Sequence, residues 1–178
     1  ASDVYMRQDI GARLLGLGFP GGPAIQNTAQ GATEAEKFPR AWLGDTFDFS
    51  FSGLKTSLLH RTQKLSDDSF DQSGRMKKSV IASQAAAYQE SIADVLSEKA
   101  IRAAKRYKAK GILIGGGVAA NSRLRELIAQ RSPIPTLIPK NSLCTDNGAM
   151  IAAAALYHLE NGERSSFDID VTPNMSLA

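Results

Sequence analysis

The chain has 178 residues, of which 43% are hydrophobic and 22% charged, so it can bury one sizeable core but not two full domains. No apolar run approaches the ~20 residues of a membrane helix, and no secretory leader pattern opens the sequence. The single cysteine, Cys144, excludes an internal disulfide framework, so we expect a soluble, cytoplasmic protein. The net charge of +3 suits an anionic partner without identifying one.

The first part of the chain predicts two short helices around a sharp loop. Residues 9–17 carry apolar side chains at helical spacing. Three glycines and two prolines in residues 18–23 then break any helix. Pro23 can start the second helix, because its missing N–H costs nothing there, and Gly31 follows the last helical residue, Gln30.

The next segment predicts a strand, a tight turn and helices. Residues 47–51 alternate aromatic and polar side chains, as a half-buried strand does. Ser52 is a candidate N-cap for a helix over 54–65. Residues 65–74 are rich in serine and aspartate and predict an exposed loop. Apolar spacing over 76–107 then predicts one long helix or a bent pair.

The second half alternates strands and helices. We expect strands over 112–114 and 136–138, with helices over 121–130 and 145–159. Such alternation is typical of an α/β protein with a mainly parallel sheet whose faces are covered by helices.

Two groups of basic residues stand at the two ends of the predicted helix over 76–107. Cations near a helix C-terminus are favoured by the helix dipole whatever the partner, which favours a purely structural explanation for the second group. A solvated surface and a nucleic-acid contact are both open for these residues. The groups are Arg75, Lys77 and Lys78, and Arg102, Lys105, Arg106, Lys108 and Lys110.

A glycine turn joins the predicted strand over 112–114 to the helix that follows. Gly115, Gly116 and Gly117 leave the backbone accessible to a ligand and permit positive φ angles. The helix that starts at Asn121 presents its N-terminal N–H groups in the same direction. This pattern suits a nucleotide, although a purely structural turn is the alternative.

The pattern differs from the common phosphate-binding loops. Its glycine spacing is not that of the dinucleotide fingerprint, and it is not a Walker A loop. Asn121, with Arg123 and Arg125 behind it on the predicted helix, favours ligand contact over a structural turn.

A second polar constellation opens the last predicted helix. Thr145 can cap it, and Asp146 would occupy its first turn, where an acidic residue is stabilised by the dipole without any ligand. Cys144 is next to them. Because neither His60 nor His158 lies in a recognisable catalytic context, a buried cysteine is favoured over a nucleophile.

Four separated motifs together resemble the TsaD family, formerly called the glycoprotease or YgjD family. The resemblance covers residues 9–178, and residues 1–8 either match nothing in the family or are an addition to the natural sequence. The family usually reads Gly-Glu-Ala-Phe-Asp-Lys where this chain reads Tyr-Met-Arg-Gln-Asp-Ile at residues 5–10. The motifs are residues 19–23, 48–56, 115–121 and 144–150.

The resemblance implies a fold and an activity. It implies an actin-like ATPase fold of the ASKHA, ribonuclease H-like type, of which this chain would be mainly the C-terminal lobe. The implied enzyme is a tRNA N6-adenosine threonylcarbamoyltransferase, which moves threonylcarbamoyl from threonylcarbamoyl-adenylate to an adenosine beside the tRNA anticodon. The implied partners are tRNA, TsaB and TsaE, and a homodimer or heterodimer is a further expectation.

The resemblance also implies which residues contact the nucleotide, whether threonylcarbamoyl-adenylate or an ATP/ADP-type ligand. These are Asp9, Gly22, Gly115, Gly116 and Asn121. No residue stands out as a catalytic acid or base, so we expect the chemistry to depend on positioning and electrostatics.

The resemblance implies a metal ligand at Asp146, for one divalent iron or zinc ion. The family's other ligands are two histidines of a His-x-x-x-His motif in the N-terminal lobe, and neither His60 nor His158 matches them. We therefore expect weak or absent metal binding, and no turnover, by these 178 residues alone.

Two other functions are weighed against the transferase. A non-catalytic, actin-like assembly module would pair with a related protein through exposed apolar surface. An actin-like kinase would need a glycine-rich phosphate loop with a catalytic aspartate after a strand, and neither is found.

Overall fold

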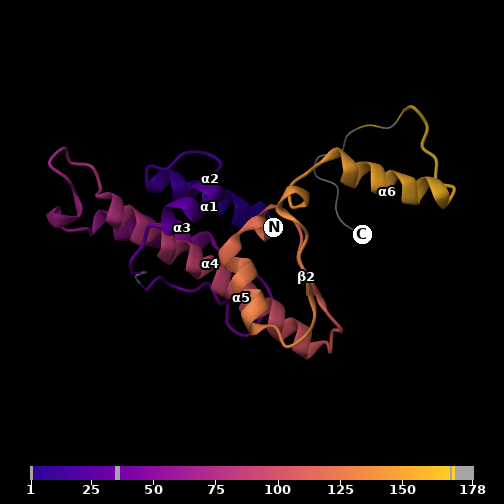
Figure 1. Cartoon of the computed structure of the whole chain (residues 1–178), viewed down its shortest axis with the longest axis horizontal. Coiled ribbons are helices and arrows are strands. Elements are labelled where there is room, and N and C mark those ends of the chain that lie inside the picture. Colours follow the sequence, from indigo (N-terminus) through magenta and orange to yellow (C-terminus); the bar gives the residue numbers. More distant parts are fainter. Residues whose placement is uncertain (1, 35–36, 169, 171–178) are drawn as a thin grey trace. The chain divides into compact units, whose positions relative to one another are not determined.

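The computed structural model describes residues 2–34, 37–168 and 170. The chain divides into two compact units, Ala1–Thr145 and Asp146–Ala178. Figure 1 labels the helices and strands along the chain. None of the helices in the described residues combines the length and the apolar character needed to cross a membrane.

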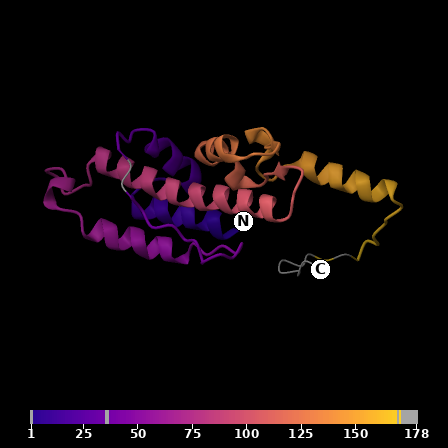
Figure 2. The same ribbon diagram turned by 90° about the horizontal axis from the view of Figure 1, so that it is seen from below.

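The first unit is built around one helix, α4, which runs without a break from Lys78 to Arg106. Many of its buried residues are alanines, so neighbouring helices can approach it closely. α1 (Ser2–Leu14), α2 (Gly21–Ala29) and α5 (Ser122–Arg131) pack against it, and Figure 2 shows it as the long helix through this unit. The helix predicted over 76–107 is therefore a single one.

The core of the first unit centres on Tyr88 of α4, whose side chain is fully buried. Its hydroxyl donates a hydrogen bond of 2.9 Å to the carbonyl of Arg7 in α1. Its ring lies edge-on to Phe38, with 5.7 Å between the ring centroids. Gly11 of α1 lets the ring lie against the helix backbone, because a Cβ there would come within 2.6 Å of it. Tyr88 thus joins α1 to α4.

α3 (Ser52–Gln63) packs against α1 and buries Leu54 and Leu58. The prediction that Ser52 caps this helix is wrong, because Phe51 occupies the N-cap position and Ser52 is the first helical residue. The loop predicted over 65–74 is exposed along most of its length and contains one short 3₁₀ turn, Asp67–Ser69.

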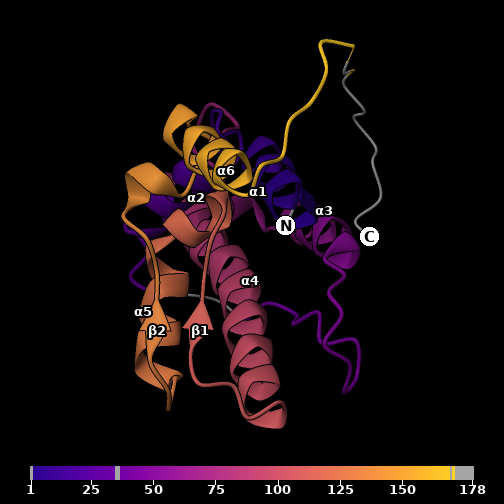
Figure 3. The ribbon, with the colours of Figure 1, turned by 90° about the vertical axis from the view of Figure 1, so that its right-hand side faces the viewer.

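The sheet consists of two short strands, β1 (Ile112–Leu113) and β2 (Thr136–Leu137), which pair in parallel with Ile112 opposite Thr136. Figure 3 shows the two strands side by side and pointing the same way. α5 lies between them in the chain, as the crossover that a parallel pair requires. The predicted parallel α/β arrangement is confirmed here, with a sheet of two strands among the described residues.

The two sides of this strand pair differ in burial. Ile114 and Ile138, at the ends of the strands, pack against a buried cluster of α4 and α5 residues. Leu113 and Leu137 point the other way and are 75% and 68% exposed. One face of the sheet is therefore apolar and uncovered within this unit, so the expectation that helices cover the faces of the sheet holds here for one face only.

The strand predicted over residues 47–51 is wrong, because this segment is irregular. The backbone N–H and C=O groups of a strand need hydrogen-bond partners on a neighbouring strand. Here the backbone carbonyl of Asp48 is hydrogen-bonded by a side chain instead. Lys99 of α4 is 1% exposed, and its Nζ donates to the Asp48 carbonyl at 2.5 Å. The same ammonium lies 5.4 Å from the centroid of the Phe49 ring. The alternating residues thus form a loop, which the buried Lys99 holds through Asp48 and Phe49.

Asp94 of α4 joins two segments that are far apart in the chain. Its carboxylate accepts hydrogen bonds from Arg40 at 2.7 Å and from Arg131 of α5 at 2.6 Å. Burial by itself would raise the pKa of Asp94, but the hydrogen bonds from these two arginines outweigh burial and hold the pKa below its ordinary value of 3.8.

We expect Asp94→Asn to make the free energy of unfolding less dependent on acidic pH. A carboxyl with a depressed folded pKa stabilises the fold above its unfolded pKa, and this stabilisation disappears as the pH falls through the folded value. Urea unfolding between about pH 5 and about pH 3 should therefore show a larger loss for the wild type than for the variant. Asp45→Asn is the control, since Asp45 pairs with Arg102 while its side chain is 99% exposed. Equal losses in wild type and Asp94→Asn would contradict the prediction.

The second unit contains α6 (Gly148–Glu160). The sequence predicted that Thr145 would cap this helix and that Asp146 would lie in its first turn, and both predictions are wrong. Asn147 is the N-cap, and its Oδ1 accepts from the Met150 N–H at 3.0 Å. Every residue of α6 is exposed, although the helix is rich in apolar side chains.

Candidate functional site

The glycine turn after β1 exposes its backbone, as the sequence predicts. Gly115, Gly116 and Gly117 are exposed, and Gly116 has φ 85° and ψ 171°, a conformation that residues other than glycine rarely adopt. A short 3₁₀ turn, Gly117–Ala120, follows and leads into α5. The backbone of these glycines is therefore accessible to a ligand.

Asn121 is the N-cap of α5 and has two protein partners. Its Oδ1 accepts from the Leu124 N–H at 3.0 Å, and its Nδ2 donates to Oε1 of Gln89 at 2.9 Å. The residue is 8% exposed. Each of these side-chain atoms can take part in one more hydrogen bond, so a contact between Asn121 and a nucleotide stays a prediction.

The two arginines that follow Asn121 stabilise the turn and the helix. The Arg123 guanidinium pairs with Glu90 of α4 at 2.6 Å and with Glu126 at 3.1 Å. These hydrogen bonds, that to Glu90 first, raise the pKa of Arg123 further above its ordinary value despite its partial burial. Arg125 donates to the carbonyl of Ala119 at 2.6 Å, which fixes the end of the 3₁₀ turn.

Cys144 is buried, as predicted. Its surroundings are more polar than the sequence suggests, because an Nη of Arg125 lies 3.2 Å from its Sγ. The same guanidinium nitrogen donates to the Pro139 carbonyl at 2.7 Å. Arg125 thus ties the segment after β2 to the segment after β1.

Asp9 and Gly22 lie where α1 meets the start of α2. The Oδ1 of Asp9 accepts from the Gly21 N–H at 2.7 Å, so this carboxylate satisfies one N-terminal donor of α2. A Cβ on Gly21 would lie 2.4 Å from the Asp9 Cα, which shows how closely the two backbones approach. Gly22 faces Gln8, whose Oε1 would lie 3.0 Å from a Cβ.

Contacts link the helices that carry Asp9 and Gly22 to the glycine turn and to the start of α5. The Ser122 N–H donates to Oε1 of Gln26 in α2 at 2.7 Å, which links α2 to the start of α5. The ring of Tyr5 in α1 lies beside Gly117, where a Cβ would be 3.7 Å from it. Sequence reasoning missed both Gln26 and Tyr5. Gln26 stands one helical turn after Gly22, and that spacing is the only signal that could have pointed to it.

Asp146, the predicted metal ligand, belongs to the second unit and is exposed just before the cap of α6. Among the residues that the structure describes, no three histidine, cysteine, aspartate or glutamate side chains lie close enough together to hold a metal ion. A protein metal site of the catalytic type uses about three side-chain ligands. The described residues alone therefore do not fit a metal centre.

These elements define an α/β protein with an exposed glycine turn between a strand and a capped helix, and comparison with known proteins identifies its family. Residues 8–153 match the model of the TsaD family, described as tRNA N6-adenosine threonylcarbamoyltransferase. The chain therefore belongs to the TsaD family. The predicted actin-like fold class is confirmed as well, since six α-helices and a small parallel sheet among the described residues are consistent with it.

Curated relatives carry the same name as the family. The tRNA N6-adenosine threonylcarbamoyltransferase of Thermomicrobium roseum is 46% identical over 182 residues, which cover 95% of this chain and 50% of the relative. Relatives of that name from Dehalococcoides mccartyi and Clostridium botulinum are 40% and 44% identical, over 95% and 93% of this chain and 48% of each relative. The chain thus spans about half the length of the curated relatives it matches.

Proposed function

We propose that this chain is the C-terminal lobe of a tRNA threonylcarbamoyladenosine transferase, and that its glycine turn binds the adenosine part of threonylcarbamoyl-adenylate. The observation that carries the proposal is the exposed backbone of Gly115 and Gly116, next to the buried Asn121, in a chain of this family. Exposed glycine backbone lets a ligand such as the polar edge of a purine ring approach closely. At the start of α5, by contrast, the N–H groups of Ser122 and Leu124 already donate to Gln26 and Asn121.

In the proposed reaction, the N6 amine of a tRNA adenosine attacks the carbamoyl carbon. A C–N bond forms as the bond from that carbon to the adenylate phosphate oxygen breaks, and AMP leaves while the amine proton passes to solvent. The residues of this chain hold and orient the leaving adenylate. Asp9 and Gly22 lie on helices that are linked to the glycine turn and to the start of α5. None of these groups acts as an acid or base, so the contribution is one of positioning.

The proposed enzyme also uses partners and a metal that these 178 residues do not supply. Asp146 would be one ligand of a divalent iron or zinc ion that, when bound, polarises an oxygen of the adenylate. The other ligands would come from the N-terminal lobe. The proposed partners are tRNA and proteins of the TsaB and TsaE type, in the cytoplasm.

A transfer assay tests whether the chain needs its other lobe. We expect no threonylcarbamoyl transfer to a tRNA transcript by the 178 residues alone. Both reactions contain threonylcarbamoyl-adenylate, a divalent metal ion and proteins of the TsaB and TsaE type. Transfer should appear when the 178 residues are combined with the N-terminal half of the Thermomicrobium roseum relative. Transfer by the 178 residues alone would contradict the need for a second lobe.

A binding experiment tests the adenosine role of Asn121. We expect Asn121→Asp to weaken AMP binding about tenfold, measured by calorimetry, because the cap acceptor is kept while the Nδ2 donor is lost. The amide of Gln89 can turn to donate to the new carboxylate, so the fold should be retained. Asn147→Asp is the matched control, because Asn147 is also an asparagine N-cap. Equal AMP affinities of Asn121→Asp and wild type would contradict the role.

A second function, an assembly module that pairs with a related protein, is favoured by one observation. α6 exposes four large apolar side chains by half or more, with Ile151 at 72%, and contiguous exposed apolar surface commonly marks an interface. We expect Ile151→Glu to shift the sedimentation of a wild-type dimer toward a monomer, with His158→Glu as a control on the same helix. A monomeric wild type at high concentration would count against this function.

A further inference from the structure

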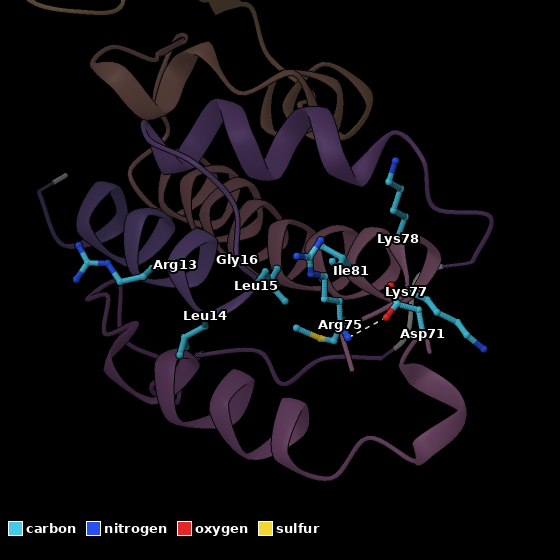
Figure 4. A pocket seen from close by; sticks show the side chains of 10 residues that line it. Arg13, Leu14, Leu15, Gly16, Asp71, Arg75, Lys77, Lys78 and Ile81 are labelled. Carbon is cyan, nitrogen blue, oxygen red and sulfur yellow. Dashed lines mark hydrogen bonds between the residues drawn. The ribbon is translucent and has the colours of Figure 1, made fainter. Parts of the chain in front are cut away.

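An open pocket of about 740 Å³ lies where the end of α1 approaches the start of α4. Its apolar lining includes Leu14, Leu15 and Ile81. Four cations surround this lining and come from segments about sixty residues apart in the chain (Figure 4). We call them the Arg13 patch: Arg13, Arg75, Lys77 and Lys78.

The side chains of the Arg13 patch are exposed and available to a ligand. Figure 4 shows Lys77 and Lys78 extending away from the start of α4 and Arg13 at the opposite side of the pocket. Within residues 2–34, 37–168 and 170, no ion pair involves any of the four. Charge that is neither paired nor buried attracts anions from solution.

The one carboxylate in the pocket is already engaged by its own loop. Asp71 accepts hydrogen bonds from the N–H and the hydroxyl of Ser73, at 2.8 and 2.6 Å, and from the N–H of Arg75 at 3.0 Å. Asp67 and Asp68 stand on the nearby 3₁₀ turn but do not line the pocket. The cations of the patch therefore outnumber the carboxylate that lies among them.

Local helix energetics do not explain the two lysines of the patch, which stand at the start of α4. Lys77 is the N-cap of α4 and Lys78 its first residue, and the first turn contains no acidic residue. Positive charge at a helix N-terminus is disfavoured by the helix dipole. The cations at the other end of α4, Lys105 and Arg106, are placed where the dipole favours them. Lys77 and Lys78 therefore oppose local stability, whereas Arg13 stands in the last turn of α1, where the dipole favours a cation.

The arrangement suits a polyanion more than a small anion. A single phosphate needs donors that converge on one point, whereas these cations are spread around an open pocket. Spaced lysines and arginines are the usual contacts to successive phosphates of a nucleic acid backbone. We propose that the Arg13 patch binds backbone phosphates of the tRNA substrate, which rests on the proposed transferase function.

The test compares two variants with equal net charge. The patch variant, Arg75→Gln/Lys77→Gln/Lys78→Gln, removes three of the four charges of the patch. The second variant, Lys105→Gln/Arg106→Gln/Lys108→Gln, removes three exposed cations at and just beyond the other end of α4. Fluorescence anisotropy with a labelled, unmodified tRNA transcript measures affinity over a range of salt. We expect the patch variant to bind tRNA at least about tenfold more weakly, with a salt slope reduced by about 2.7, and the second variant to change affinity less than about threefold.

Further arms separate the possible outcomes. Arg13→Gln, on a different segment, should weaken tRNA binding about twofold to threefold, and circular dichroism should show that every variant folds. Equal weakening by the two triple variants, unchanged binding by the patch variant, or no tRNA binding by the wild-type chain would each overturn the proposal. Binding to anionic phospholipid vesicles is measured as well. If the patch variant lost affinity for the vesicles and not for tRNA, the proposal would also be overturned. AMP binding is measured on the same variants, and we expect their AMP affinity to equal that of the wild type. If the wild-type chain did not bind AMP, this would contradict the proposed adenosine site and not the tRNA patch.

Discussion

Tyr88→Ala is expected to lower the free energy of unfolding by about 4 kcal/mol, which is a large part of the stability of an ordinary domain. The side chain is fully buried and packs against Phe38 and the backbone at Gly11. Its removal leaves a cavity and removes the hydrogen bond to the Arg7 carbonyl. Urea unfolding followed by circular dichroism measures the change.

Tyr88→Phe is the control for this prediction, because it keeps the ring and removes only the hydrogen bond to Arg7. We expect it to cost about 1 kcal/mol. If the alanine variant were no less stable than the phenylalanine variant, Tyr88 would not be the packing centre between α1 and α4.

The second large effect is expected at Gly21, where α2 begins against α1. A Cβ at this position would lie 2.4 Å from the Asp9 Cα and 2.6 Å from the Gln8 carbonyl oxygen. These neighbours are backbone atoms and cannot move without separating the two helices. We expect Gly21→Ala to cost about 3 kcal/mol and to break the hydrogen bond between the Gly21 N–H and Asp9.

Gly22→Ala is the matched control, one residue further along the same helix. Its Cβ would meet only the end of the Gln8 side chain, at 3.0 Å. Alanine is also the better helix former, so we expect a change within about 1 kcal/mol. Thermal unfolding of both variants checks the contrast, and a Gly22→Ala variant as unstable as Gly21→Ala would show that close backbone approach is not the cause.

Local patterns predicted the helices better than the strands. The apolar spacing over 76–107 identified a helix because the face that packs on its neighbours is written in the sequence at helical intervals. The aromatic alternation over 47–51 was misleading, because a strand also requires a partner and this segment is held by Lys99 instead. The capping prediction for Ser52 was wrong because α3 begins after Phe51, which makes no side-chain cap hydrogen bond. The prediction for Thr145 was wrong because another polar residue, Asn147, is the N-cap of α6.

The part of the candidate site that consists of glycines could be predicted from the sequence, because it depends on the backbone conformations that only glycine adopts readily. Gly116 does adopt a positive φ angle, as a glycine run before a helix suggests. The partner of Asn121 could not be foreseen, because Gln89 is 32 residues earlier and meets it only through the packing of α5 on α4. Tyr5 likewise lies beside the turn only through tertiary packing. Gln26, which binds the Ser122 N–H at the start of α5, was signalled only by its spacing from Gly22.

The unbroken course of α4 sets a fixed length inside the first unit. Lys78, in the proposed tRNA patch, and Gln89, which holds Asn121, are separated by eleven residues of the same helix. At 1.5 Å per residue, this is about 16 Å along a stiff rod. An insertion of one residue between them would lengthen the rod and also turn its far end by about 100°. The number of residues between Lys78 and Gln89 would therefore fix the distance between the bound RNA backbone and the bound adenylate.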